Sequence, residues 1–127
     1  MTATRVLVVE DDPSVRGLLR TLLTAEGYDV VTASDGLAGL VQAAMTTPAL
    51  ILLDLMMPDL GGVRVLAELQ EDPDLSGTPV IVVTGKADAM PQMRELLGED
   101  NVFLKPFAVG ELLARVQQVT GGPGAGG

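Results

Sequence analysis

The sequence predicts an α/β fold in which a doubly wound, five-stranded parallel sheet carries helices on both faces. Short runs rich in Val and Leu alternate with segments whose apolar residues recur at helical spacing, and this unit appears five times. The strand runs are continuously apolar, which is typical of parallel strands buried on both faces. A chain of 127 residues with 47% apolar and 20% charged residues can build one core of its own.

The first half of the chain contains three of the expected strands. Residues 5–9 form the first apolar run, and Asp12 and Pro13 then mark a helix start, because an Asp N-cap and a proline at the first helical position both favour a helix N-terminus. Gly27 ends this helix. A strand, a helix and a strand are expected next, at residues 28–33, 34–46 and 49–53.

The second half continues the same alternation. Helices and strands are expected in turn at residues 61–72, 79–83, 87–98, 101–104 and 109–119. The folded domain is therefore expected to span residues 1–120. Residues 121–127 are rich in Gly and are expected to form a flexible tail, either a frayed end or the remnant of a linker to a further domain.

The composition excludes several classes of site. The chain has no Cys and no His, which rules out disulfides, thiolate or imidazole metal sites and the Ser-His-Asp triad. Its net charge of −9 and its three aromatic residues argue against direct binding of nucleic acid. No apolar run is long enough to cross a membrane, and no secretory signal begins the chain, so a cytoplasmic location is expected.

Polar residues follow four of the five expected strands. Glu10 and Asp11 follow the first strand, Asp54 the third, Thr84 the fourth and Lys105 the fifth. Because ligands of open α/β sheets bind beyond the carboxyl ends of the strands, this edge is expected to hold the functional site.

The residue types at this edge suggest a phosphoryl group held by a metal ion. Converging carboxylates repel one another unless a cation lies between them, and oxygen ligands select a hard ion such as Mg²⁺ or Mn²⁺. Lys105 and Thr84 can receive the oxygens of an anion. With no thiol or imidazole in the chain, Asp54 is the central candidate for a nucleophile, which would form an acyl phosphate.

Four short strings resemble the receiver domain of bacterial two-component response regulators. They are VVEDDP at residues 8–13, LLDLMMPD at 52–59, VVTG at 82–85 and LKPF at 104–107. They occur in order, each at a strand end, and the resemblance covers residues 5–119. It implies a flavodoxin-like receiver fold with five helices and the strand order 2-1-3-4-5.

The resemblance also implies a metal site. Glu10 and Asp11 would be the acid pair for Mg²⁺, or Mn²⁺ in its place, with Asp11 binding directly and Glu10 through water. Asp54 and the backbone carbonyl of Met56 would complete the protein ligands.

The phosphoryl chemistry implied by the resemblance centres on Asp54. This residue would accept the phosphoryl group from a phosphohistidine of a sensor histidine kinase or phosphotransfer protein. Lys105 would contact the phosphoryl group, its bond to Pro106 would be cis, and the Thr84 hydroxyl would swing inward as a switch. Such a protein is a switch that modifies itself and not a turnover enzyme. Its output would come from a downstream protein or from an output domain that this chain lacks.

One position departs from the family pattern. Receivers often carry Tyr or Phe three residues before the Lys, where it moves in concert with the Thr hydroxyl. Here that position is Val102, and the aromatic residue is Phe103, one place later. The aromatic step of signal propagation is therefore not expected in its usual form.

The response to phosphorylation is expected on the fourth helix, fifth strand and fifth helix. This surface resembles that of receivers in winged-helix transcription factors, which dimerise through it, and Asp100, Glu111 and Arg115 match charged positions there. No basic residue on the fourth helix is evident as a partner for Glu111, because Pro91 lies in that region. A weak homodimer and a monomer are both open.

A phosphatase, a cofactor binder and a protein interaction module are the three alternatives to a phosphorylated receiver. A phosphatase of the haloacid dehalogenase type would need a second Asp where Met56 stands. A cofactor binder of the flavodoxin type would need a phosphate-binding loop where the acidic Glu10 and Asp11 stand. A receiver that acts only as a protein interaction module, without phosphorylation, stays open because of Val102.

Overall fold

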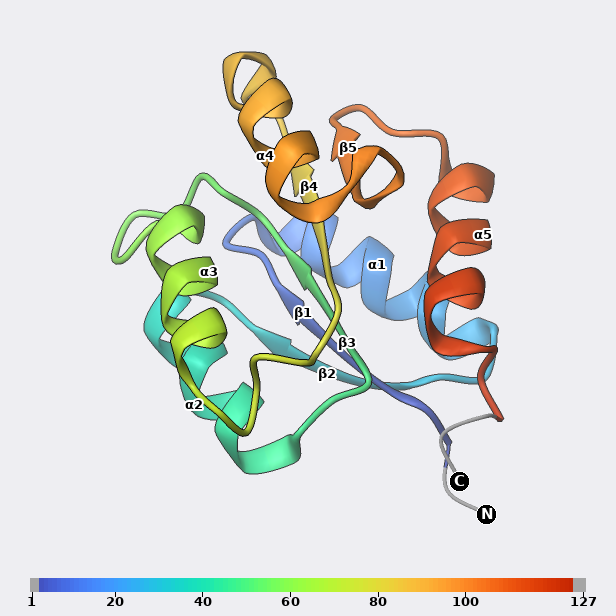
Figure 1. Cartoon of the computed structure of the whole chain (residues 1–127). Helices are drawn as coiled ribbons and strands as arrows, with labels where there is room; N and C mark the ends of the chain where they lie inside the picture. Colours follow the sequence, from blue (N-terminus) through green and yellow to red (C-terminus); the bar gives the residue numbers. More distant parts are fainter. Residues whose placement is uncertain (1–2, 125–127) are drawn as a thin grey trace.

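The computed structural model describes residues 3–124, which form five parallel strands in the order β2-β1-β3-β4-β5 (Figure 1). The strands are β1 (Arg5–Val9), β2 (Asp29–Ala33), β3 (Leu50–Leu53), β4 (Val80–Thr84) and β5 (Val102–Leu104). The helices are α1 (Pro13–Ala25), α2 (Gly36–Thr46), α3 (Gly62–Glu71), α4 (Met90–Leu97) and α5 (Val109–Thr120). Two single-turn 3₁₀ helices, η1 (Ala87–Ala89) and η2 (Glu99–Asn101), flank α4.

The helices cover both faces of the sheet, so the core has two halves (Figure 1). Alternate residues of one strand enter different halves: Leu7 and Val9 pack with α2, α3 and α4, whereas Val6 and Val8 pack with α1 and α5. All four of these side chains are at most 1% exposed. This burial on both faces explains why the strand sequences are continuously apolar.

The structure confirms the predicted fold class, strand order and five helices. Most element boundaries lie within one residue of the sequence prediction. The largest difference concerns residues 87–98, expected as one helix, which divide into η1 and α4. Pro91 lies in the first turn of α4, where its missing N–H costs no helical hydrogen bond, so the regular α-helix starts at Met90.

The described part of the predicted Gly-rich tail contacts the start of the chain. Gly121 ends α5 in the left-handed conformation with φ 80°, which turns the chain back toward Thr4. The Thr4 backbone N–H donates to the Pro123 carbonyl at 2.8 Å, and its hydroxyl donates to the Gly122 carbonyl at 2.9 Å. Residues 125–127 of that tail lie outside the described residues.

No helix among residues 3–124 has the length and apolar character that crossing a membrane requires.

Candidate functional site

The parallel register brings the predicted site residues to one edge of the sheet. The backbone N–H of Asp54 donates to the carbonyl of Val9 at 3.0 Å, which places Asp54 beside Glu10. The backbone N–H of Lys105 donates to the carbonyl of Thr84 at 2.8 Å. The residues that follow β1, β3, β4 and β5 therefore lie along one edge of the sheet.

Three carboxylates converge at this edge. Oxygen atoms of Glu10, Asp11 and Asp54 all lie within 4.8 Å of one another. The side chains of Glu10 and Asp54 are almost fully buried, while Asp11 is half-buried and open to solvent. A buried cluster of like charges is unfavourable without a cation, so the arrangement calls for one.

Lys105 reaches this cluster from β5. Its ammonium donates a hydrogen bond to Glu10 Oε1 and lies 3.4 Å from Asp54 Oδ2. The Lys105–Pro106 peptide bond is cis, as expected from the sequence. One ammonium against three carboxylates leaves the cluster with excess negative charge.

Burial and charge shift the pKa values of Glu10 and Lys105. Burial raises the pKa of Glu10 to about 7; the neighbouring Asp54 carboxyl adds to the rise, and Lys105 opposes it. Burial alone would lower the pKa of Lys105, but its hydrogen bond to Glu10 and the nearby carboxylates outweigh this, so the pKa of Lys105 lies above its usual value. In the metal-free protein, Glu10 therefore titrates near neutral pH while Lys105 stays charged.

The raised pKa of Glu10 predicts that the contribution of this residue to the stability of the metal-free protein falls as pH rises. Because this pKa moves from 4.5 to about 7 on folding, the folded state binds more protons than the unfolded state between these values. Glu10→Gln does not titrate, so its free energy of unfolding should match the wild type near about pH 4 and exceed it by on the order of 2–3 kcal/mol at about pH 8. Urea unfolding with a chelator present measures this, and parallel pH profiles would contradict it.

Thr84 is fully buried at the end of β4. Its hydroxyl accepts a hydrogen bond from the backbone N–H of Lys86 at 3.1 Å. The next residue, Gly85, is exposed, and a Cβ built there would meet nothing within 4 Å. The Thr84 hydroxyl is therefore bonded to the loop that follows β4, and there is open space beside Gly85 in that loop.

The loop after β3 is folded closely against Asp54. The backbone N–H of Met56 donates to Asp54 Oδ1 at 3.1 Å, while the Met56 side chain is exposed. At the far end of the loop, Gly62 donates to the carbonyl of Leu55 at 2.9 Å. A Cβ at Gly62 would lie 2.4 Å from the Asp54 carbonyl oxygen, so this approach requires glycine.

Two residues near the acid pair have structural roles. Asp12 caps α1, as the sequence predicts, by accepting hydrogen bonds from the backbone N–H groups of Ser14 and Val15. Arg16, which sequence reasoning missed, donates to the carbonyls of Glu10 at 2.9 Å and Asp11 at 3.2 Å. The sequence pattern holds no signal for this contact, because it depends on the path of the irregular backbone before α1.

Val102 and Phe103 point to opposite faces of the sheet. Val102 is 6% exposed and packs in the half of the core that contains Met90 and Met93 of α4. Phe103 packs with the other half, which contains Val116 of α5. Successive residues of a strand face opposite sides, so Phe103 cannot take the place of an aromatic residue at position 102.

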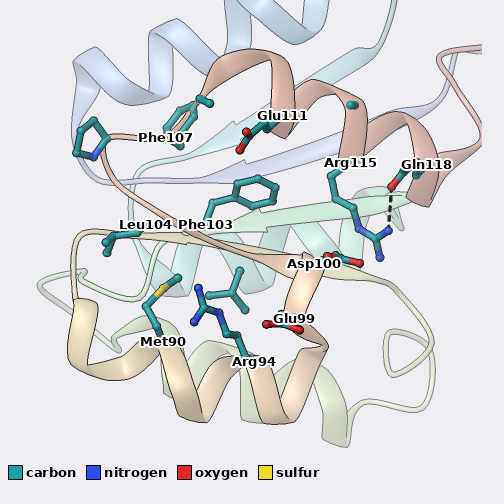
Figure 2. A pocket seen from close by; sticks show the side chains of 14 residues that line it. Met90, Arg94, Glu99, Asp100, Phe103, Leu104, Phe107, Glu111, Arg115 and Gln118 are labelled. Carbon is teal, nitrogen blue, oxygen red and sulfur yellow. Dashed lines mark hydrogen bonds between the residues drawn. The ribbon is translucent and has the colours of Figure 1, made fainter.

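An open groove of about 620 Å³ lies between α4, β5 and α5 (Figure 2). Arg94 of α4 and Glu111 of α5 line its opposite walls, with Phe103 between them. Arg94 is the basic residue on the fourth helix that the sequence reasoning did not find. Arg115 donates to Asn101 Oδ1 at 2.9 Å and to Gln118 Oε1 at 3.1 Å, so it is held within its own chain.

The donor set suits Mg²⁺. Glu10, Asp11 and Asp54 offer only carboxylate oxygens as ligands. They lie at the edge of the sheet, and Asp11 is partly exposed to water. Mg²⁺ prefers oxygen ligands, keeps several waters and is usually held by one or two carboxylates together with phosphate oxygens. These residues therefore fit a magnesium ion better than a softer metal.

Comparison with known proteins matches this chain to response regulators. The family model for the response regulator receiver domain matches residues 6–117. The "DNA-binding response regulator MtrA" of Mycolicibacterium smegmatis is 40% identical over 114 residues, which cover 89% of this chain and 49% of that protein. The "Probable transcriptional regulator ycf27" of Porphyridium aerugineum is 39% identical over 94% of this chain and 49% of its own length. The chain thus spans about half the length of the curated relatives it matches.

Solved structures show the same fold. The receiver domain of the Francisella response regulator 1452 aligns with a TM-score of 0.82 and 29% identity, covering 93% of this chain and 97% of that one. The chemotaxis response regulator CheY4 of Vibrio cholerae aligns with a TM-score of 0.82 and 28% identity, covering 93% and 99% of the two chains. The chain belongs to the response regulator receiver domain family of two-component systems.

Proposed function

We propose that this receiver accepts a phosphoryl group on Asp54 from the phosphohistidine of a sensor histidine kinase or phosphotransfer protein. Receiver domains generally bind Mg²⁺ and interact with histidine kinases and output domains. The observation that supports phosphorylation here is the convergence of Asp54 with Glu10, Asp11 and Lys105 at one edge of the sheet. The protein acts as a self-modifying switch and not as a turnover enzyme, and its expected place of action is the cytoplasm.

The transfer forms one bond and breaks one. A carboxylate oxygen of Asp54 attacks the phosphorus atom and forms a P–O bond, while the P–N bond of the phosphohistidine breaks and its electron pair stays on the imidazole. Mg²⁺, when bound, neutralises the oxygens of the transferring group. Asp11 would hold it directly, Glu10 through water, and Asp54 and the Met56 carbonyl would complete the protein ligands.

Lys105 and Thr84 respond to the new charge. The Lys105 ammonium already lies 3.4 Å from Asp54 Oδ2, so it is placed to contact phosphoryl oxygens. Thr84 would exchange its hydrogen bond with the Lys86 backbone for one to the phosphoryl group. Because Thr84 ends β4 beside β5 and leads into η1 and α4, its movement would change the groove lined by Arg94 and Glu111.

The output partner is a second protein or a further domain. The relatives named as transcriptional or DNA-binding regulators are about twice as long as the matched part, so an output domain following this receiver is one form of the proposal. A weak homodimer through α4, β5 and α5 is the other expected contact. Arg94 and Glu111 offer opposite charges for it, although exposed ion pairs contribute only about 0–1 kcal/mol each.

A second candidate function is a phosphorylation-independent interaction module. The observation that favours it is Val102, because no aromatic side chain can move between α4 and β5 at this position. The two candidates differ in whether Asp54 is modified.

The metal assignment predicts that Asp11→Ala weakens Mg²⁺ binding by at least about tenfold, because one carboxylate charge at a distance of a few ångströms contributes several kcal/mol at an effective dielectric near 20. Isothermal titration calorimetry of the metal-free protein measures the affinity. Asp12→Ala is a matched control, since it removes an adjacent charge that caps α1 instead. Unchanged affinity in Asp11→Ala would exclude Asp11 as a ligand.

Intact-mass analysis after incubation with acetyl phosphate tests the proposed function. A single phosphoryl adduct that requires Mg²⁺ is expected. No adduct, under conditions in which a stable beryllofluoride mimic also fails to bind, would favour the interaction module.

A further inference from the structure

We propose that Asp59 is a positioning residue for the metal site, because its carboxylate ties the loop that carries Met56 to the first turn of α2. This inference rests on the proposed function, since it concerns how the Met56 carbonyl is held in place as a ligand. Neither the motif strings nor the site residues expected from the sequence gave Asp59 a role.

The contact joins two elements that lie far apart in the sequence. Asp59 Oδ1 accepts a hydrogen bond from the backbone N–H of Gly36 at 2.9 Å, and Oδ2 accepts one from Leu37 at 2.9 Å. Those hydrogen bonds, with Leu37 and then Gly36 as the main partners, lower the pKa of Asp59, so the carboxylate stays ionised at neutral pH. The loop is therefore fixed to α2 by two charge-assisted hydrogen bonds.

This contact does more than cap a helix. α2 already has its own N-cap, because Asp35 Oδ1 accepts from the Ala38 N–H at 2.8 Å. Asp59, in the loop after β3, accepts hydrogen bonds from the two N–H groups of this helix terminus that Asp35 does not bind, those of Gly36 and Leu37. Because Asp35 already caps the helix, the further effect of the Asp59 contact is to fix the outer part of the loop against α2.

The local packing is built for this approach. Gly36 is buried, and a Cβ there would lie 2.8 Å from Val65 Cγ2, 3.1 Å from Leu60 Cβ and 3.3 Å from Asp59 Oδ1. A larger residue at position 36 would push the loop away from α2. The same closeness is found at Gly62, which packs on the backbone of Asp54 at the other end of the loop.

The loop thus has fixed points on both sides of Met56. The Gly62 N–H donates to the Leu55 carbonyl and holds the ends of the loop together beside β3, and Asp59 holds its outer part against α2. Met56 itself has an exposed side chain, 57% accessible, which provides little anchoring of its own. Loss of the Asp59 contact would let the backbone around Met56 move relative to Asp54, and a ligand that is not held loses metal affinity.

Calorimetric Mg²⁺ titration and thermal unfolding of three variants test the proposal. Asp35→Ala is the matched control, because it removes one carboxylate from the same helix terminus without touching the loop. Both Asp35→Ala and Asp59→Ala should lower the melting temperature. Only Asp59→Ala should weaken Mg²⁺ binding, by about tenfold, as for other residues that hold a metal ligand in place. Asp59→Asn keeps a hydrogen-bond acceptor without the charge and should recover part of the affinity.

Three results would overturn the proposal. Wild-type Mg²⁺ affinity in Asp59→Ala would show that the loop holds Met56 without this contact. Equal weakening in Asp59→Ala and Asp35→Ala would assign the effect to charge or to the stability of α2. Absence of Mg²⁺ binding by the wild type would refute the proposed metal site itself, a failure that is distinct from the first two.

Discussion

Replacing Asp54 by Asn is expected to abolish phosphorylation by acetyl phosphate completely. The amide has nearly the shape of the carboxylate but no anionic oxygen to attack phosphorus, and the chain has no Cys or His to act as another nucleophile. Asp54 is 5% exposed and lies beside Glu10, so removing its charge relieves repulsion and should not unfold the protein.

Intact mass and circular dichroism measure this loss and the retention of the fold. Asp74→Asn is a suitable control, because it makes the same chemical change at an exposed residue in the turn after α3. A phosphoryl adduct of normal yield on Asp54→Asn would show that another residue is modified. That result would remove Asp54 from the account.

Replacing Lys105 by Ala is expected to slow phosphorylation by about a hundredfold, the usual cost of removing one donor aimed at developing negative charge. Mg²⁺ affinity should be kept or should rise, because the ammonium that lies 3.4 Å from Asp54 Oδ2 opposes a second cation there. The combination of slow phosphorylation with intact metal binding separates an anion receiver from a metal-site residue.

The matched control is Lys86→Ala, which removes the same charge from an exposed position two residues beyond Thr84. Rates of adduct formation at saturating Mg²⁺ and calorimetric Mg²⁺ affinities should both be measured. Lys105→Ala with the rate of the wild type would contradict the assigned role. Loss of Mg²⁺ binding in this variant would show that Lys105 instead maintains the carboxylate cluster.

The fold and the main site residues could be predicted from the sequence because both depend on local patterns. Continuous apolar runs such as residues 5–9 define buried parallel strands, and parallel strands bring their carboxyl ends to one edge. The sequence alone therefore groups Glu10, Asp54 and Lys105. Their proximity follows from topology alone.

Contacts made across loops could not be predicted in the same way. Arg16 reaches back to the carbonyls of Glu10 and Asp11, and Asp59 reaches the terminus of α2, but neither contact follows from strand order. Both depend on the path of irregular backbone, which sequence periodicity does not encode. The hydrogen bond that the Thr84 hydroxyl accepts from the Lys86 N–H could not be predicted either, because local backbone geometry decides the rotamer of the hydroxyl.

The groove shows a different limit of sequence reasoning. Arg94 lies three residues after Pro91 on the fourth helix and lines the same groove as Glu111, which the sequence did not indicate. The start of α4 at Met90 sets the helical phase that turns Arg94 toward α5. A shift of one or two residues in a helix start changes which side chain faces the neighbour, and such boundaries are the least certain part of a sequence-based assignment.

Locating the phosphoryl group by peptide mass spectrometry is the most direct test of the central claim. After treatment with acetyl phosphate and Mg²⁺, borohydride reduces an aspartyl phosphate to homoserine and marks the modified residue permanently. The mark is expected at Asp54 alone and should be absent when Mg²⁺ is chelated. A mark at Asp11 or Asp12, or a protein that stays unmarked while Mg²⁺ binds, would contradict it.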